Sequence, residues 1–181
     1  SYGGGQRGGR QYQGGRRIGG DRDMTEGNAL KYGNNINTDI ISPPQYMELP
    51  VEEAARYAMS AVDPDFYRKV RKGDIFVAGS NLGSGSSRET SPLTLKYLGV
   101  SVVAAKSFAR IFYRNLINVG IPAIECRDTD KIREGDRLRV DVKEGYIYNL
   151  TRSERYKCQK LPEHLMKIIE AGGLFQYLKE V

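Results

Sequence analysis

The chain has 181 residues and a formal net charge of +6, and half of that charge lies in residues 1–23. This length allows a single compact core, and the rest of the chain is only mildly basic, so the charge gives no reason to expect a nucleic-acid partner. No apolar run approaches the length of a membrane span, and the N-terminal segment lacks the apolar stretch of a signal peptide.

The N-terminal segment differs in composition from the rest of the chain. Residues 1–27 are rich in glycine and begin with an arginine-glycine stretch that cannot bury a core, so we expect a disordered tail there and a folded domain at 28–181. We assign the tail no site. The two cysteines, Cys126 and Cys158, match no metal-ligand spacing and indicate no disulfide framework, so we expect a reducing cytoplasm.

Apolar periodicity and turn residues predict an alternation of strands and helices along the body. In chain order we expect a strand at 28–33, a polar loop at 34–44, helices at 51–59 and 65–70, a strand at 75–78, a glycine-rich loop at 79–90, a helix at 92–98, a strand at 100–105, a helix at 111–119, a strand at 122–125, a β-hairpin at 137–150 that turns at Glu144 and Gly145, a helix at 163–171 and a short terminal helix. Some strands follow helices and others form a hairpin, which indicates an α/β fold with a mixed sheet.

The glycine-rich loop, GSNLGSGSSRET at 79–90, is the most informative segment for function. A glycine-rich turn between a buried strand and a helix brings backbone N–H groups to a helix N-terminus, where an anion is favoured. Ser86 and Ser87 add hydroxyl groups, and Arg88 adds a planar fork that matches a carboxylate or a phosphate. The sequence therefore predicts a receptor for a small acid.

Other chemistries fit this loop less well. Its glycines resemble a dinucleotide-binding fingerprint, but the spacing differs and the following strand ends without an acidic residue to hold a ribose. A nucleotide-binding module therefore remains an alternative function for this loop. His164 is the only histidine and is expected on a helix surface, so we expect no metal site built by this chain alone.

Four segments carry a resemblance to a known family: NNINTDIISP at 34–43, GSNLGSGSSRE at 79–89, AKSFARIFYRN at 105–115 and AGGL at 171–174. They resemble, in the same order, the small subunits of 3-isopropylmalate dehydratases and, more broadly, the swivelling domain of the aconitase family. The resemblance implies a swivelling β/β/α domain at 28–181 that closes over a separate large subunit carrying a [4Fe–4S] cluster, with no cofactor on this chain.

The same resemblance implies a hydro-lyase of leucine biosynthesis. Such enzymes isomerise 2-isopropylmalate and 3-isopropylmalate by dehydration and rehydration, with iron acting as a Lewis acid on the hydroxyl. The small subunit is active only with its large subunit, in the cytoplasm. A homoaconitase or a dimethylmalate dehydratase is the alternative within the family. The expected partners are thus the large subunit and a small hydroxy di- or tricarboxylic acid, with neither a membrane nor a nucleic acid.

Carried over residue by residue, the resemblance makes Ser86 the base that removes the substrate's carbon-bound proton. It makes Arg88 the ligand of a substrate carboxylate, assisted by Ser87 and by the backbone at Gly85. Asp39 matches a buried loop aspartate of the family, which organises the site or serves only as a cap. Arg110, in the third segment, either reaches the site or forms a structural ion pair.

The segment after the two prolines, QYMELP at 45–50, matches the family's substrate-reading loop. Homoaconitases place an arginine there, whereas this chain has Met47, Glu48 and Leu49. We expect Glu48 to repel an additional carboxylate and Met47 and Leu49 to contact an apolar substituent. The chain also has Ser84 where many relatives have cysteine, and Thr90 where they have histidine or glutamine.

Overall fold

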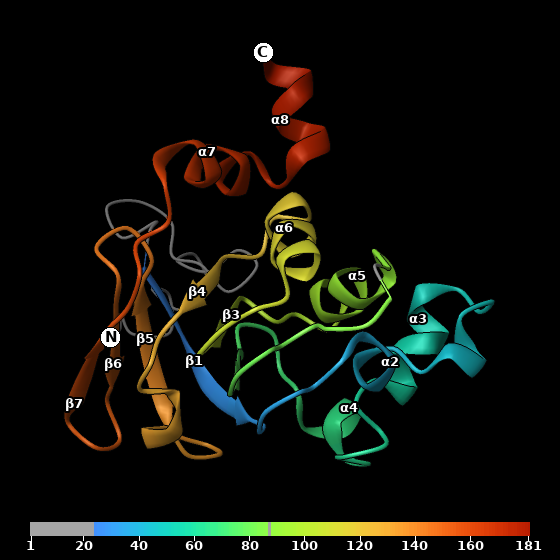
Figure 1. Ribbon diagram of the computed structural model, residues 1–181, viewed down its shortest axis with the longest axis horizontal. Coiled ribbons are helices and arrows are strands. Elements are labelled where there is room, and N and C mark those ends of the chain that lie inside the picture. Colours follow the sequence, from blue (N-terminus) through green and yellow to red (C-terminus); the bar gives the residue numbers. More distant parts are fainter. Residues whose placement is uncertain (1–23, 87) are drawn as a thin grey trace, which may run out of the picture.

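The computed structural model describes residues 24–86 and 88–181, so most of the predicted tail and Ser87 lie outside the described residues. Seven strands form one sheet, in the order β4-β3-β2-β1-β5-β6-β7 (Figure 1). The strands are β1 (Met24–Lys31), β2 (Ile75–Ala78), β3 (Val102–Ala105), β4 (Ala123–Glu125), β5 (Arg137–Asp141), β6 (Tyr146–Asn149) and β7 (Glu154–Lys157). Strands β1 to β4 pair in parallel and β5 to β7 pair antiparallel, which confirms the predicted mixed sheet.

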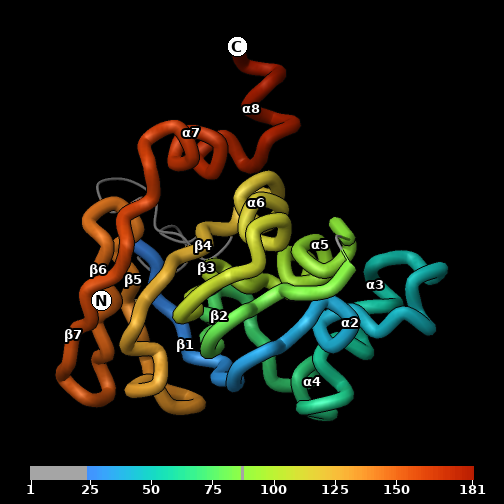
Figure 2. Tube along the Cα trace, viewed as in Figure 1, coloured from blue at the N-terminus to red at the C-terminus, as the bar shows by residue number. Residues whose placement is uncertain are grey.

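Most helices lie on the side of the molecule that holds the parallel strands. The β5–β7 meander forms the other side (Figure 2). The α-helices are α2 (Thr38–Ile41), α3 (Val51–Ala54), α4 (Phe66–Lys69), α5 (Thr90–Tyr97), α6 (Arg110–Asn118), α7 (Glu163–Ala171) and α8 (Leu174–Glu180). Three short 3₁₀ turns are also present: η1 (Pro44–Tyr46), η2 (Ala55–Tyr57) and η3 (Thr129–Lys131). Helix α5 connects β2 to β3, which confirms the predicted β–α–β unit.

The core is centred on the parallel strands. Every residue of β2 and β3 is buried, and both strands are continuous apolar runs, as expected where a parallel sheet is covered on both faces. In β5 and β6, buried residues alternate with partly exposed ones, as in a sheet with one face toward the core. The two edges of the sheet also meet, because the Gln159 N–H beyond β7 donates to the Glu125 carbonyl in β4 (2.9 Å).

Strand pairing and tertiary contacts explain three differences between the predicted and the observed elements. Strand β1 begins at Met24 rather than at Asn28, because Met24–Asn28 pair with β5. The predicted helix at 51–59 is a short α3 followed by η2, since the Met59 N–H bonds to the Ile40 and Ile41 carbonyls and Met59 has a positive φ of 61°. Strand β7 was not predicted, because three of its four residues are charged and only Tyr156 points into the core.

The polar loop at 34–44 contains the unpredicted helix α2. Asn37 caps this single turn, because its side-chain oxygen accepts the Ile40 N–H at 2.8 Å. Thr38 and Ile41 are buried, which anchors the turn to the core. The predicted helix at 163–171 needs no such correction, since it is α7 with its αL glycine cap at Gly172.

Candidate functional site

Three loops converge at the carboxyl ends of β1, β2 and β3, where ligands commonly bind in open α/β sheets. The Gly79 N–H donates to the Gly33 carbonyl after β1 (3.0 Å), and the Lys106 N–H after β3 donates to the Gly79 carbonyl (3.0 Å). The glycine-rich loop is therefore fastened on both sides at its first residue. The first and third family-like segments meet the second one here, although they are far apart in the sequence.

The first half of the glycine-rich loop does not offer bare N–H groups, contrary to the expectation from its sequence. The N–H groups of Leu82 and Gly83 donate to the Ser107 and Ile36 carbonyls at 3.0 and 2.7 Å. Those of Ser80 and Asn81 donate to the side-chain oxygens of Asn34 and Ser107, each at 2.8 Å. These donors hold the loop to its neighbours, so the candidate anion site lies at the end of the loop.

Helix α2 positions that end of the loop. The Thr38 N–H donates to the Ser84 carbonyl and the Thr38 hydroxyl to the Ser86 carbonyl, both at 2.9 Å. Between them Gly85 has φ +100°, a left-handed conformation that favours glycine. A Cβ at Gly85 would also lie 3.4 Å from the Thr38 hydroxyl. Thr38 thus fixes the backbone on which Ser86 is presented.

Ser86, Arg88 and Asp39 form one polar cluster. The Arg88 Nε–H donates to Ser86 Oγ at 3.1 Å, and another nitrogen of the same guanidinium forms an ion pair with Asp39. The Arg88 side chain is only 19% exposed, whereas that of Asp39 is 53% exposed, so the expectation of a buried aspartate is wrong. Asp39 lies in the first turn of α2, close enough to orient the guanidinium from the outside.

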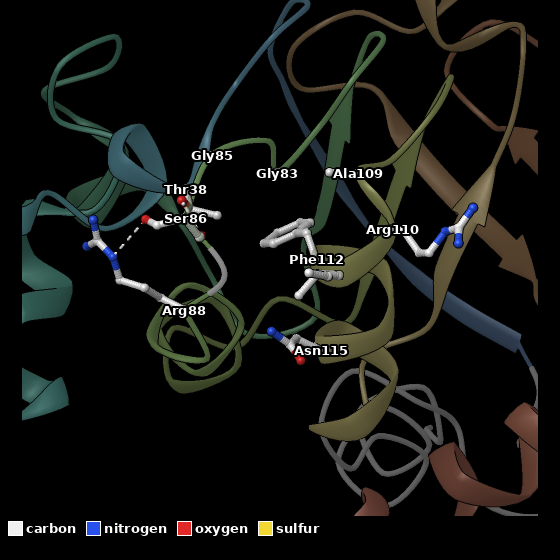
Figure 3. Close-up of a pocket in the computed structure, with 10 residues that line it drawn as sticks. Thr38, Gly83, Gly85, Ser86, Arg88, Ala109, Arg110, Phe112 and Asn115 are labelled. Carbon is white, nitrogen blue, oxygen red and sulfur yellow. Dashed lines mark hydrogen bonds between the residues drawn. The ribbon is translucent and has the colours of Figure 1, made fainter.

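A cavity of about 200 Å³ opens beside Ser86. In Figure 3, Ser86 lies between the Arg88 guanidinium and the Phe112 ring. Gly83 fits against this ring because a Cβ there would lie only 2.1 Å from it. The residues that line the cavity are Thr38, Gly83, Gly85, Ser86, Arg88, Ala109, Arg110, Ile111, Phe112 and Asn115. The floor is thus the start of α6 and the polar wall is the end of the glycine-rich loop.

A second, smaller cavity of about 30 Å³ lies on the other side of Arg88, which lines both. Its lining is mostly apolar or hydroxyl-bearing: Ser42, Pro43, Tyr46, Met47, Leu49, Val51, Ala54, Arg88, Thr90 and Thr94. Met47 and Leu49 therefore share a cavity with Arg88, and their predicted contact with the substrate stays a prediction. Glu48 is exposed and is not among the lining residues of either cavity.

Arg110 is the predicted site residue that stands apart. It borders the larger cavity, but its guanidinium points away from Ser86 and Arg88 in Figure 3. Ser87 is outside the described residues, so its predicted role stays a prediction. The segment that contains Arg110 serves the site through its backbone and Ser107, which hold Asn81 and Leu82.

Six residues that line the larger cavity were not among the predicted site residues: Thr38, Gly83, Ala109, Ile111, Phe112 and Asn115. Thr38 is adjacent to the predicted Asp39, and a one-turn helix with an Asn cap could have signalled its role. Phe112 and Asn115 are three residues apart on α6, a spacing that places them on one helix face. Their link to the glycine-rich loop is a long-range contact that no local pattern encodes.

Within residues 24–86 and 88–181, no group of three or more His, Cys, Asp or Glu side chains is placed to hold a metal ion. In the same ranges, no helix has both the length and the apolar character needed to cross a membrane.

The chain that carries this site is similar to known proteins. Residues 11–129 match the model of the aconitase C-terminal domain. The chain is 53% identical over 161 residues to the isopropylmalate/citramalate isomerase small subunit of Methanocaldococcus jannaschii, covering 88% of this chain and 96% of that protein. It is 48% identical over 157 residues to the 3-isopropylmalate dehydratase small subunit of Methanosarcina acetivorans, covering 86% of this chain and 97% of the relative.

A solved structure has the same fold. The crystal structure of 3-isopropylmalate dehydratase from Methanocaldococcus jannaschii superposes with a TM-score of 0.83 at 41% sequence identity, covering 87% of this chain and 94% of that one. The match therefore covers nearly the whole of that chain.

Proposed function

The chain belongs to the family of the aconitase C-terminal domain, and we propose that it is the small subunit of a hydro-lyase that interconverts 2-isopropylmalate and 3-isopropylmalate. The names of its relatives support this reaction, which belongs to leucine biosynthesis. The observation that carries the proposal is the contact between Ser86 Oγ and the guanidinium of Arg88, a residue that also lines a small cavity containing Met47, Leu49 and Val51. A hydroxyl base, a carboxylate ligand and an alkyl pocket are what an alkylmalate needs.

We propose that the metal chemistry of the reaction belongs to a separate subunit. Among its described residues, no three or more His, Cys, Asp or Glu side chains of this chain are grouped so that they could hold a metal ion. We propose that a large subunit carries a [4Fe–4S] cluster, which supplies a Lewis acid for the departing hydroxyl. We also propose that the complex acts in the cytoplasm, which agrees with two cysteines that are both free thiols.

On this proposal, Ser86 acts as the base in the dehydration. Its Oγ takes the carbon-bound proton, the electron pair of the broken C–H bond forms the double bond, and the hydroxyl leaves from the neighbouring carbon. Because the Arg88 Nε–H already donates to Ser86 Oγ, a positive charge and a hydrogen bond both favour the anionic form of the hydroxyl. In rehydration the same oxygen returns the proton to carbon.

Arg88 has a second task in this mechanism. Its remaining N–H groups can bind a substrate carboxylate in bidentate geometry, while the Nε–H stays with Ser86. The bound carboxylate then holds the reacting carbon beside the base. Asp39 restrains the guanidinium from the outside, so that less conformational freedom is lost when the substrate binds.

The smaller cavity indicates the substrate's variable group. Since Met47, Leu49 and Val51 line it beside Arg88, an alkyl group next to the bound carboxylate is favoured over a charged arm. We therefore propose an alkylmalate rather than a tricarboxylate. Citramalate, which has a smaller alkyl group, is a second candidate because the relative at 53% identity is named for both substrates.

Reconstitution tests this proposal. The full chain is mixed anaerobically with the large subunit of its own organism and assayed on 3-isopropylmalate, citramalate and homocitrate-type acids. We expect no turnover by either subunit alone, turnover of alkylmalates by the mixture and little of the tricarboxylate. Preference for the tricarboxylate would refute the substrate assignment. An inactive mixture, together with binding of a nicotinamide nucleotide by the chain alone, would favour a nucleotide-binding module.

A further inference from the structure

The two cysteines of the chain lie at opposite edges of the sheet in strand order. Cys126 directly follows β4 and Cys158 directly follows β7, and these are the two terminal strands. The sheet curves so that these edges meet, as the hydrogen bond from Gln159 N–H to the Glu125 carbonyl at 2.9 Å shows. Both cysteines are buried at this seam, with 2% and 8% of their surfaces exposed.

The backbone hydrogen bond at the seam indicates a register in which the two cysteines are opposite each other. Strand β4 is parallel to β1 through β3 and β2, whereas β7 is antiparallel to β1 through β5 and β6. The edges therefore meet antiparallel, and if Glu125 is opposite Gln159, then Cys126 is opposite Cys158. Adjacent to a hydrogen-bonded pair comes a non-hydrogen-bonded pair, with Cα atoms about 4.5 Å apart and side chains close together. That spacing is within the range that a disulfide bridges.

Side-chain contacts agree with this register. Cys126 Sγ lies 3.8 Å from the carbonyl oxygen of Lys157, the residue that precedes Cys158. A hydrogen bond from the Cys158 thiol lowers the pKa of Cys126, and the same bond, followed by burial, raises the pKa of Cys158. A lowered pKa favours the thiolate form of Cys126, and thiolates are the nucleophiles of disulfide exchange.

We propose that Cys126 and Cys158 form a reversible disulfide that joins the two edges of the sheet when low-molecular-weight disulfides accumulate around the protein. The Cys126 thiolate attacks one sulfur of a disulfide such as oxidised glutathione, breaks the S–S bond and releases one thiolate. Cys158, after losing its proton, then attacks Cys126 Sγ and releases the second thiolate. The two cysteine protons end on the two released thiols, so one disulfide is reduced as one is formed.

The bridge is expected to stabilise the fold. It closes the chain between Cys126 and Cys158, a segment that includes β5, β6 and β7, and so restricts the unfolded chain. In a reducing compartment the pair stays as thiols, as in the present structure. The inference does not depend on the proposed enzymatic function, because neither cysteine lines either cavity of the site.

The experiment uses the full chain with its two cysteines. Protein reduced with dithiothreitol and then freed of it is incubated in glutathione buffers of increasing oxidised fraction. Free thiols are then alkylated in denaturant, and the intact mass is measured together with the melting temperature. Cys126→Ala and Cys158→Ala are the matched variants, since each retains one thiol.

Each outcome decides the question. We expect an intramolecular disulfide in the wild type, with no alkylated thiol and no added glutathione, and a melting temperature several degrees above that of the reduced protein. The single variants should acquire glutathione or stay free, without that increase. The proposal is overturned if both wild-type thiols remain alkylatable in the most oxidising buffer, if only mixed or interchain disulfides form, or if the oxidised protein melts no higher. If a variant fails to fold, the wild-type comparison alone decides.

Discussion

Arg88 folds back onto the residue two positions before it, and this local geometry organises the candidate site. Its N–H and Nε–H both point at Ser86, to the carbonyl oxygen and to Oγ, each at 3.1 Å. Asp39 holds the far side of the guanidinium. Because the charge, the hydroxyl and the acid are already in contact before any ligand arrives, little reorganisation is needed on binding.

Substitution of Ser86 by alanine tests the base. Because the hydroxyl would accept a proton only in the transition state, Ser86→Ala lowers kcat of the reconstituted enzyme by at least about a hundredfold, with a smaller effect on KM. Ser84→Ala is the control, since it removes a hydroxyl from the same loop and leaves the Ser84 carbonyl that Thr38 binds. Turnover close to that of the wild type in Ser86→Ala would exclude this residue as the base.

Arg88→Lys tests the carboxylate ligand. Lysine keeps the positive charge but cannot bind Ser86, Asp39 and a carboxylate in one planar arrangement, so we expect substrate binding to weaken by about 1–3 kcal/mol. Calorimetry of the assembled enzyme with substrate or product measures this loss. Arg114→Lys, on the exposed side of α6, is the matched control. An unchanged affinity in Arg88→Lys would show that the guanidinium has only a structural role.

At the scale of elements, the loop at 45–50, which we propose reads the substrate, has a role that depends on the direction of its side chains. Tyr46 of this loop stacks on Tyr57 of η2, with ring centroids 3.8 Å apart and ring planes within 9° of parallel. This stack holds the loop against the helices. Met47 and Leu49 then line the cavity next to Arg88, while Glu48 lies outside the lining.

Introducing an arginine into this loop tests whether the loop determines substrate specificity. We expect Met47→Arg to shift the ratio of kcat/KM from alkylmalate towards tricarboxylate at least about tenfold, because a cation enters the cavity and the alkyl contact is lost; that ratio corresponds to about 1.4 kcal/mol. Glu48→Arg should act in the same direction but less, since Glu48 does not line the cavity. Glu170→Arg on α7 is the control. Equal ratios in all four proteins would show that this loop does not read the substrate.

Elements set by local pattern were predictable and those set by distant contacts were not. The apolar run of β2, the glycines after it and the spacing of α5 all lie within one segment, and they indicated a strand, a loop and a helix correctly. Helix α7 was predicted for the same reason. The prediction of one helix at 51–59 was wrong because the Met59 N–H bonds to the carbonyls of Ile40 and Ile41. Strand β7 was not predicted because its charged residues give no sequence pattern for its pairing with β6.

At the scale of the whole molecule, the candidate site exists because three distant segments meet at one end of the parallel strands. Sequence motifs identified Ser86, Arg88 and Asp39 individually, and the resemblance assigned their roles. Their contact, the occupied N–H groups of the loop and the place of Phe112 depend on packing across the sheet. Such packing leaves no periodic trace in the chain, which is why the outward direction of Arg110 was not predictable.

The antiparallel half of the sheet contains a buried carboxylate, Asp136, that contributes to the pH dependence of the protein's stability. Burial by itself would raise the pKa of Asp136, but hydrogen bonds from the Asn149 side chain, the Arg133 N–H and the Arg152 side chain outweigh it, so the pKa lies below its ordinary value. A lowered pKa in the folded state stabilises the protein above the ordinary carboxyl value near 4, and this stabilisation is lost as the pH falls through the lowered pKa. Asp74, whose pKa is raised by burial, acts in the opposite direction.

Replacement of Asp136 by asparagine should therefore lower the free energy of unfolding and also change how that free energy depends on pH. Asp136 is 3% exposed and its Arg152 partner stays behind in the variant, so we expect Asp136→Asn to lower the free energy of unfolding at pH 7 by about 3–5 kcal/mol. Because the difference between the two proteins comes from an ionised carboxylate, it should shrink as the pH falls below about 4. Urea denaturation at a series of pH values measures both effects. Asp65→Asn is the control, since the exposed Asp65–Arg68 pair contributes little. A difference that persists undiminished in acid would mean that the asparagine disturbs packing and that the charge of Asp136 is not what stabilises this half of the sheet.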